Sequence, residues 1–323
     1  MVSRKYIGSE LVDWVGAESL ELVEAASGWP SHYRAKTPSG WVRVAAYLGP
    51  IGHSQRGRGD VERRFQNPGS NRPILSTPGE LPLLLGAYES DGTRLLVGME
   101  VGKRLGKKTR QSLFMPLYLL RSAGYWGWAE HFSDVGEQLV AFAPRLLPVY
   151  VDLRQSGVEI PANAVEQLVV ASGAGDEEAG SDAVRRAIAT ISRLVRGAEF
   201  SRDVRKAYDG HCAMCGLDFT LVEGAHIYPV SAPGSKDEIW NGVALCRNHH
   251  AAFDSFLLYV HPKSQRIQLH PRVIEQSSHI AGCKAFVDAT FPTLAPPRQA
   301  ADRPRRAMFE KRYEFFNPKY SWV

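Results

Sequence analysis

Cysteine is scarce in this chain, with four residues among 323. A small secreted scaffold held together by disulfides would use more cysteines and spread them along the chain, so that class is excluded. Three of the four cysteines fall between residues 212 and 246. We therefore expect a cytoplasmic protein whose cysteines serve one local site.

Long hydrophobic runs are also missing. No stretch reaches the roughly 18 consecutive apolar residues of a membrane-spanning helix. Residues 1–16 have neither the apolar core nor the small-residue cleavage pattern of a secretory signal. No internal repeat is visible either. These absences predict a soluble globular protein that does not enter a membrane.

The composition is that of an ordinary globular chain, with 44% hydrophobic and 23% charged residues. A length of 323 residues favours two domains. The formal net charge is +5, which favours a polyanionic partner; a basic but otherwise ordinary surface is the alternative.

Residues 1–155 read as a strand-rich mixed α/β domain, because short apolar runs recur between Gly, Pro and Ser boundaries. The aromatic stretch 124–132 is more typical of a core than of a base-stacking platform. The predicted strand segments are residues 41–49, 81–89, 94–101, 112–120 and 137–153.

A basic loop lies between the third and fourth of these runs and contains no acid. It could contact DNA phosphates, although a solvated loop is an equal alternative. The long, polar segment 52–73 is of the kind that is functional or disordered. The cations of the basic loop are Lys103, Arg104, Lys107, Lys108 and Arg110.

A Gly/Ala/acid stretch before residue 182 marks the predicted domain boundary. After it, apolar residues from Val184 to Val195 recur at three- and four-residue intervals, which predicts an amphipathic helix capped by Ser181. A second short helix is expected to begin at Ser201. The predicted organisation is a first domain over 1–155, a linker and helix over 156–200, a second domain over 201–290, and a basic, aromatic extension over 291–323.

Two half-sites in the second domain have the spacing of a metal centre. Cys212 and Cys215 form a C-x2-C pair, and Cys246 and His249 repeat the i, i+3 spacing. Together they give a Cys3His set suited to a closed, tetrahedral structural zinc. Cysteines that are merely buried or redox-active are the alternative.

Further histidines accompany these half-sites. His226 lies in a run typical of a strand, where a lone histidine is usually structural. The segment 247–256 reads as a helix, on which His250 and Asp254 share one face and could bind a divalent ion. His249 points about 100° away from His250, so the two histidines can serve different sites.

The order Cys-x2-Cys, "AHIYP", "WNGVALCRNHH", "AFD" resembles the HNH (His-Asn-His, ββα-metal) endonucleases, specifically the zinc-stapled kind of bacterial restriction enzymes. The resemblance covers roughly residues 201–272. It extends to residues 256–271, which read as a closing hairpin. The fold class that follows is α+β: a strand-rich N-terminal domain, a helical linker and a C-terminal ββα-metal domain with structural zinc.

By position, the resemblance implies that His226 is the general base and that His250 binds the catalytic ion. Asn241 would orient the base or brace the loop between the strands. Many family members have an acid or histidine directly before the base, where this chain has Ala225. We predict that Asp254 supplies the missing ligand; a capping or salt-bridging role for Asp254 is the alternative.

The side chains named above can supply the two functions that phosphodiester hydrolysis needs, a base and a cation. An imidazole that titrates near neutral pH can deprotonate a water, and a cation can neutralise the charge on a phosphorane. A mixed His/Asp shell suits magnesium, manganese or a late transition metal. The implied partner is double-stranded DNA, and cutting two strands with one site per chain suggests a homodimer.

Three functions follow for the whole chain. The N-terminal domain could direct restriction of modified DNA, which is slightly favoured, or restriction of an unmodified sequence. A zinc-stapled DNA-binding module without cleavage is the third, and Ala225 is the feature in its favour. Of the remaining features, Cys283 is expected to be a buried small hydrophobe, His261 and His270 have no assigned role, and the C-terminal extension is expected to dock on the nuclease core.

Overall fold

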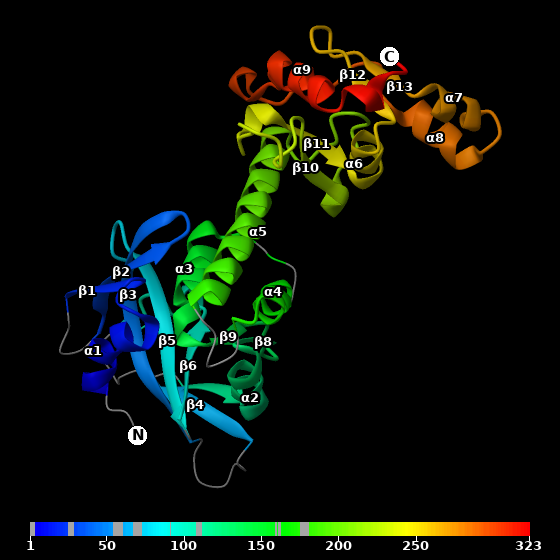
Figure 1. Ribbon diagram of the computed structural model, residues 1–323. Coiled ribbons are helices and arrows are strands. Elements are labelled where there is room, and N and C mark those ends of the chain that lie inside the picture. Colours follow the sequence, from blue (N-terminus) through cyan, green and yellow to red (C-terminus); the bar gives the residue numbers. More distant parts are fainter. Residues whose placement is uncertain are drawn as a thin grey trace. The chain divides into compact units, whose positions relative to one another are not determined.

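The computed structural model describes residues 4–24, 29–53, 61–66, 73–90, 92–107, 112–158, 160, 163–174 and 181–323. The chain divides into two compact units, Met1–Val195 and Arg196–Val323 (Figure 1). Both combine strands and helices, so the predicted α+β class is confirmed. Among the described residues, no helix is long and apolar enough to cross a membrane.

The first unit is built on one mixed sheet. Its described strands run in the order β1-β2-β3-β5-β6-β9-β8, and β4 and β7 attach through β3. β3 and β5 pair in parallel, and the other pairs are antiparallel. The strands are β1 Leu20–Glu24, β2 Ser31–Thr37, β3 Gly40–His53, β4 Glu62–Gln66, β5 Leu81–Ser90, β6 Thr93–Met99, β7 Ser112–Pro116, β8 Trp128–Phe132 and β9 Gln138–Phe142.

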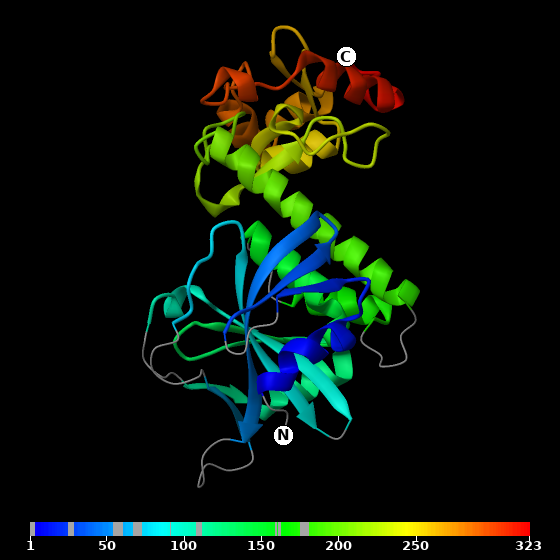
Figure 2. The ribbon, with the colours of Figure 1, turned by 90° about the vertical axis from the view of Figure 1, so that its left-hand side faces the viewer.

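Apolar residues on both faces of this sheet produce two cores. Along β3, Val44 and Ala46 face one core, whereas Ala45 and Tyr47 face the other, as side-chain alternation in a strand requires. Helices α1, α3, α4 and the first part of α5 cover the first core, and α2 covers the second (Figures 1 and 2). The helices are α1 Arg4–Val15, α2 Leu117–Trp126, α3 Leu147–Ser156, α4 Ala164–Ser172 and α5 Ser181–Ala207.

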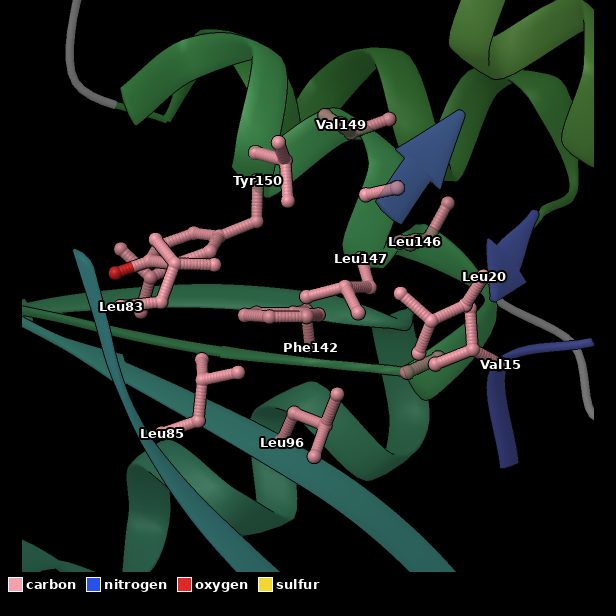
Figure 3. Packing of buried hydrophobic residues seen from close by; sticks show 14 of the residues in the cluster. Val15, Leu20, Leu83, Leu85, Leu96, Phe142, Leu146, Leu147, Val149 and Tyr150 are labelled. Carbon is pink, nitrogen blue, oxygen red and sulfur yellow. The ribbon is translucent and has the colours of Figure 1, made fainter. Parts of the chain in front are cut away.

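The first of these cores is centred on stacked aromatic rings. Phe142 of β9 lies 4.9 Å from Tyr150 of α3, ring centre to ring centre, and leucines of β5 and β6 pack around them (Figure 3). Tyr150 passes so close to Gly98 of β6 that a Cβ there would lie 2.1 Å from the phenol ring. The sheet and helix therefore meet where β6 has no side chain.

Two predicted strand segments are strands only in part. Residues 112–116 form β7, but the chain turns into α2 after Pro116; likewise 138–142 form β9, and α3 follows. A short, continuous apolar run does not distinguish a buried strand from a buried helix. The left-handed glycines that end these helices, Gly127 and Gly157, are the stop signals that the interpretation missed.

The prediction of two helices before Cys212 is wrong, because α5 is one continuous helix of 27 residues. The hydroxyl of Ser201 does not cap a helix; it accepts a hydrogen bond from Gly224 N of the second unit at 2.8 Å. A serine inside a helix whose side chain bonds elsewhere gives no local break.

The second unit begins with the last part of α5 and carries two small sheets. β10 and β11 pair antiparallel and lead into α6, which is a ββα arrangement (Figure 1). The predicted hairpin over 256–271 is confirmed as β12 and β13. The elements are β10 Val222–His226, β11 Gly242–Cys246, α6 Arg247–Asp254, β12 Leu258–Val260, β13 Ile267–Leu269, α7 Pro271–Ser277, α8 Ala281–Ala289 and α9 Arg306–Phe315.

The C-terminal extension packs on this unit, as predicted. Phe309 and Arg312 of α9 are buried, and Tyr313 Oη donates to Val260 O of β12 at 2.7 Å. The expectation for Cys283 is wrong, because it is partly exposed on α8. Cys283 lies on the short helix α8, none of whose residues is fully buried.

The aromatic stretch 124–132 is only partly core. Trp128 is 1% exposed, as predicted, but Tyr125 is 72% and Phe132 55% exposed. Strand alternation and the outer face of α2 direct these rings away from the sheet.

Candidate functional site

Three thiols and one imidazole converge in the second unit. The donor atoms of Cys212, Cys215, Cys246 and His249 all lie within 4.8 Å of one another. His249 Nδ1 is 3.7 Å from Cys212 Sγ and 3.2 Å from Cys246 Sγ, and the sulfurs of Cys215 and Cys246 are 3.9 Å apart. Such separations suit a tetrahedron around an ion about 2.0–2.3 Å from each donor. All four cysteines of the chain are free of disulfides.

Local backbone geometry presents these donors. Cys212 and Cys215 lie on a tight turn in which Gly216 N donates to Cys212 O at 2.8 Å. Gly216 has φ +73°, which disfavours any other residue. Cys246 ends β11 and His249 lies in the first turn of α6, so a strand-to-helix junction supplies the second half-site.

A hydrogen bond from the Nε2 side of the ring to Thr290 fixes the tautomer of His249. The hydroxyl of Thr290 donates to Phe286 O at 2.7 Å, so it must accept from His249 Nε2–H, 3.0 Å away. Nδ1 is then unprotonated and faces the sulfurs, as a metal ligand requires. Burial lowers the pKa of His249 to about 4, which keeps the imidazole neutral. The Cys3His cluster is consistent with a structural zinc.

His226 is the last residue of β10 and is held on two sides. Its ring stacks on Phe200 of α5 with a centre-to-centre distance of 3.7 Å, and its Nε2 lies 2.8 Å from Asp237 Oδ1. Burial lowers the pKa of His226 below its ordinary value, although Asp237 acts in the opposite direction. The arrangement gives a neutral imidazole with one nitrogen bonded to a carboxylate.

Asn241 is fully buried and binds the loop that joins β10 to β11. Its Oδ1 accepts from Tyr228 N at 2.9 Å, and its Nδ2 donates to Tyr228 O at 3.1 Å and to Lys236 O at 3.0 Å. Tyr228 lies two residues after His226, and Lys236 directly precedes Asp237. Asn241 therefore holds the loop beside both members of the His226–Asp237 contact. These contacts fit the bracing role.

His250 lies between two carboxylates. Its Nδ1 is 3.0 Å from Glu223 Oε2 of β10, and its Nε2 is 3.3 Å from Asp254 Oδ2 one turn along α6. The contact with Asp254 raises the pKa of His250, and Glu223 adds to this effect against burial. Burial raises the pKa of Asp254, but His250 and Arg312 outweigh it, so the net direction is downward.

The His250–Asp254 contact is an ion pair, which fits the salt-bridging alternative for Asp254, and its geometry also fits two adjacent ligands of one ion. Donors that each lie about 2.1 Å from a metal with octahedral geometry are about 3 Å apart, close to the 3.3 Å between His250 Nε2 and Asp254 Oδ2. With its Nδ1–H donated to Glu223, His250 would present an unprotonated Nε2 to the ion.

Sequence reasoning missed four residues around this site: Glu223, Asp237, Phe200 and Arg312. Glu223 had a signal, because it is two residues from Ala225 on the same strand and therefore on the same face. Asp237, Phe200 and Arg312 reach the site from a loop, from α5 and from α9, and no local spacing indicates such contacts.

The described cations of the basic loop differ in their exposure and pairing. Arg104 forms a bidentate pair with Glu137 at 2.5 and 2.7 Å, and both side chains are largely buried. Lys103 and Lys107 are exposed. Lys108 and Arg110 lie outside the described residues. The predicted phosphate contacts therefore concern Lys103 and Lys107 more than Arg104.

Comparison with known proteins matches two segments of the chain to protein families. Residues 212–261 match the HNH endonuclease family, and residues 42–151 match a family described as methylase-associated X1. No curated protein matches the chain. Among solved structures, the chain is similar to the modification-dependent TagI restriction endonuclease, with 12% identity, coverage of 91% of this chain and 87% of that chain, and a TM-score of 0.31. A likeness at this level does not establish a common overall fold.

Proposed function

The C-terminal module of this chain is an HNH endonuclease domain, and from this we propose that the protein is a metal-dependent DNA endonuclease of the restriction type. His226 is its general base, His250 and Asp254 bind the catalytic ion, and Asn241 braces the loop between them. The observation that carries the proposal is the imidazole of His226, held by Asp237 in the same ββα module as the His250–Asp254 pair.

His226 is arranged to accept a proton at Nδ1. Asp237 bonds to Nε2 at 2.8 Å, so the proton of the neutral ring lies on Nε2 and the lone pair on Nδ1. When Nδ1 takes a proton from water, Asp237 stabilises the resulting imidazolium. A positioned base of this kind contributes about 10²–10⁴-fold to the rate.

His250 and Asp254 provide the metal half-site, with water and substrate oxygens completing the shell. The ion, when bound, would neutralise charge on the phosphorane and the leaving oxygen. Magnesium, manganese and late transition metals all suit a His/Asp pair. The Cys3His cluster would hold a separate zinc that stabilises the fold.

Residues 1–155 would select the DNA target, residues 201–290 would cut it, and 291–323 would support the cutter. The family match within the first region is described as methylase-associated, which supports a domain that responds to the methylation state of DNA. We propose modified DNA as the target; a sequence-specific enzyme for unmodified DNA is the alternative. Because each chain has one site and two strands are cut, we propose a homodimer.

The test is a cleavage assay on matched plasmids, one unmodified and one carrying methylated or hydroxymethylated cytosine, with magnesium or manganese. His226→Ala should lower cleavage by at least about 10²-fold while DNA binding is retained. His279→Ala, an exposed histidine of the same module, is the control and should cut like the parent.

The outcomes separate the candidates. Cleavage of the modified plasmid alone supports a modification-dependent enzyme, and discrete fragments from the unmodified plasmid support a sequence-specific one. Ala225, which stands where many family members have a metal ligand, favours a module that binds without cutting. Binding to either plasmid with no metal-dependent cleavage would support that alternative, or a first domain that requires a modification absent from both plasmids.

A further inference from the structure

One buried arginine joins the two halves of the proposed active site. Arg312 of α9 has a side chain that is 2% exposed, although it comes from the C-terminal extension, outside the ββα module. A buried guanidinium is costly unless its donors are bonded. Here the donors are bonded to specific backbone atoms beside the proposed base and the proposed metal ligand.

The guanidinium bonds divide between two elements. Nη1 donates to Ile227 O at 3.1 Å, and Ile227 directly follows His226. Nη2 donates to Phe253 O at 2.8 Å, and Phe253 directly precedes Asp254. One planar, rigid group therefore fixes the separation between the end of β10 and the end of α6.

The same group also faces the Asp254 carboxylate. Nη2 lies 3.6 Å from Asp254 Oδ1, while the other oxygen, Oδ2, faces His250 Nε2 at 3.3 Å. Arg312 thus faces Oδ1 of Asp254, and Oδ2 of the same carboxylate is directed toward His250. Because Asp254 is itself 60% exposed, packing alone does not set this orientation.

The guanidinium is in turn held in place. Nε donates to Tyr320 Oη at 2.8 Å, and the ring of Phe253 lies 3.8 Å from the guanidinium carbon. Tyr320 belongs to the last residues of the chain, so the extension supplies both the arginine and its support. α9 is drawn red in Figure 1.

We propose that Arg312 is a positioning residue that presents Asp254 to the catalytic divalent ion and sets its distance from His226. The inference rests on the proposed function, because it concerns the same site. It gives the C-terminal extension a role in the reaction: α9 completes the metal half-site that the ββα elements begin.

Manganese binding to the zinc-loaded full chain tests this inference without relying on cleavage. Arg312→Lys keeps the charge but loses the planar fork, so we expect the dissociation constant for manganese to rise about tenfold, within the 10–100-fold typical of groups that orient metal ligands. Arg306→Lys makes the same change at an exposed position of α9, where the side chain meets only Glu310 in the described structure, and should bind manganese like the parent. Thermal unfolding of each variant, measured alongside, identifies the temperature range in which it is folded.

A second variant keeps the test decisive if Arg312→Lys does not fold. Tyr320→Phe removes only the hydroxyl that holds Nε, and it should weaken manganese binding by two- to threefold in the same direction. Parental manganese affinity in folded Arg312→Lys, or in Tyr320→Phe if the lysine variant is unfolded, would overturn the inference.

His250→Ala distinguishes this failure from failure of the proposed function. If His250→Ala binds manganese as tightly as the parent, the metal half-site itself is wrong, and the inference is overturned with it. If His250→Ala loses manganese binding and the Arg312 and Tyr320 variants do not, only the inference fails.

Discussion

Burial and the contact with Asp237 have opposite effects on the pKa of His226, the proposed base. Burial beside Phe200 lowers the pKa of His226, and the Asp237 carboxylate partly offsets this. Only the neutral imidazole can accept a proton, so the cleavage rate should rise with pH through this pKa and then level off. The lowered pKa therefore predicts full activity at neutral pH.

Asp237→Asn should move this rise to lower pH. The amide oxygen can still accept from Nε2–H, but the negative charge that raises the pKa of His226 is lost. The plateau rate should fall by about 10–100-fold, because the imidazolium formed during the reaction has lost its counter-charge. Single-turnover cleavage measured across pH checks both effects. A profile that keeps the parental midpoint would contradict the assignment of His226 as base, and Asp288→Asn, on the outer helix α8, is the control.

At the scale of elements, the metal-ligand cluster joins segments that are distant in the sequence. It links the turn after α5, the end of β11 and the start of α6. His249 and His250 are adjacent, so a zinc bound to His249 would also fix the helix that carries His250. The proposed structural metal therefore stabilises the geometry of the proposed catalytic one.

Cys212→Ser should abolish zinc binding and unfold the second unit. Structural zinc sites contribute binding free energy that is also folding free energy, about 10–16 kcal/mol in small zinc peptides. We expect the zinc content to fall from one ion to none per chain and the thermal transition of this unit to disappear. Cys283→Ser, at a partly exposed cysteine outside the cluster, should retain both zinc and fold. A folded Cys212→Ser protein that cuts DNA would refute the structural role.

The sequence was sufficient where chemistry and spacing coincide along the chain. The two half-sites and the hairpin after α6 are local patterns, and the structure brings the four ligands together as their spacing predicts. It was insufficient where one apolar run served two elements, as at 112–120 and 137–153. It was also insufficient for contacts between distant segments: Glu223 lies 27 residues before His250, and Arg312 reaches Ile227 across 85 residues. Such contacts depend on tertiary packing, which periodicity does not encode.

At the scale of the whole molecule, the two units have separate cores, so the proposed target binding and the proposed cutting would reside in separately packed units. The +5 charge of the chain favours DNA, but the structure shows that not every cation of the basic loop is available to it. Arg104 forms its largely buried pair with Glu137, whereas Lys103 and Lys107 are exposed.

Replacing both lysines by alanine should weaken DNA binding and reduce its salt dependence. If each lysine contacts one phosphate, the slope of log K against log salt should become shallower by about 2, since each contact contributes about 0.9. Arg104→Ala should behave differently: it leaves Glu137 buried without its partner, which costs about 3–5 kcal/mol of stability, and the slope for the folded protein should not change. The His226→Ala background, in which cleavage should be at least about 10²-fold slower, allows binding to be measured across salt concentrations with magnesium present. An unchanged slope in the double lysine variant would place the DNA contacts of the first unit elsewhere, whereas a reduced slope in folded Arg104→Ala would mean that its guanidinium leaves Glu137 when DNA binds.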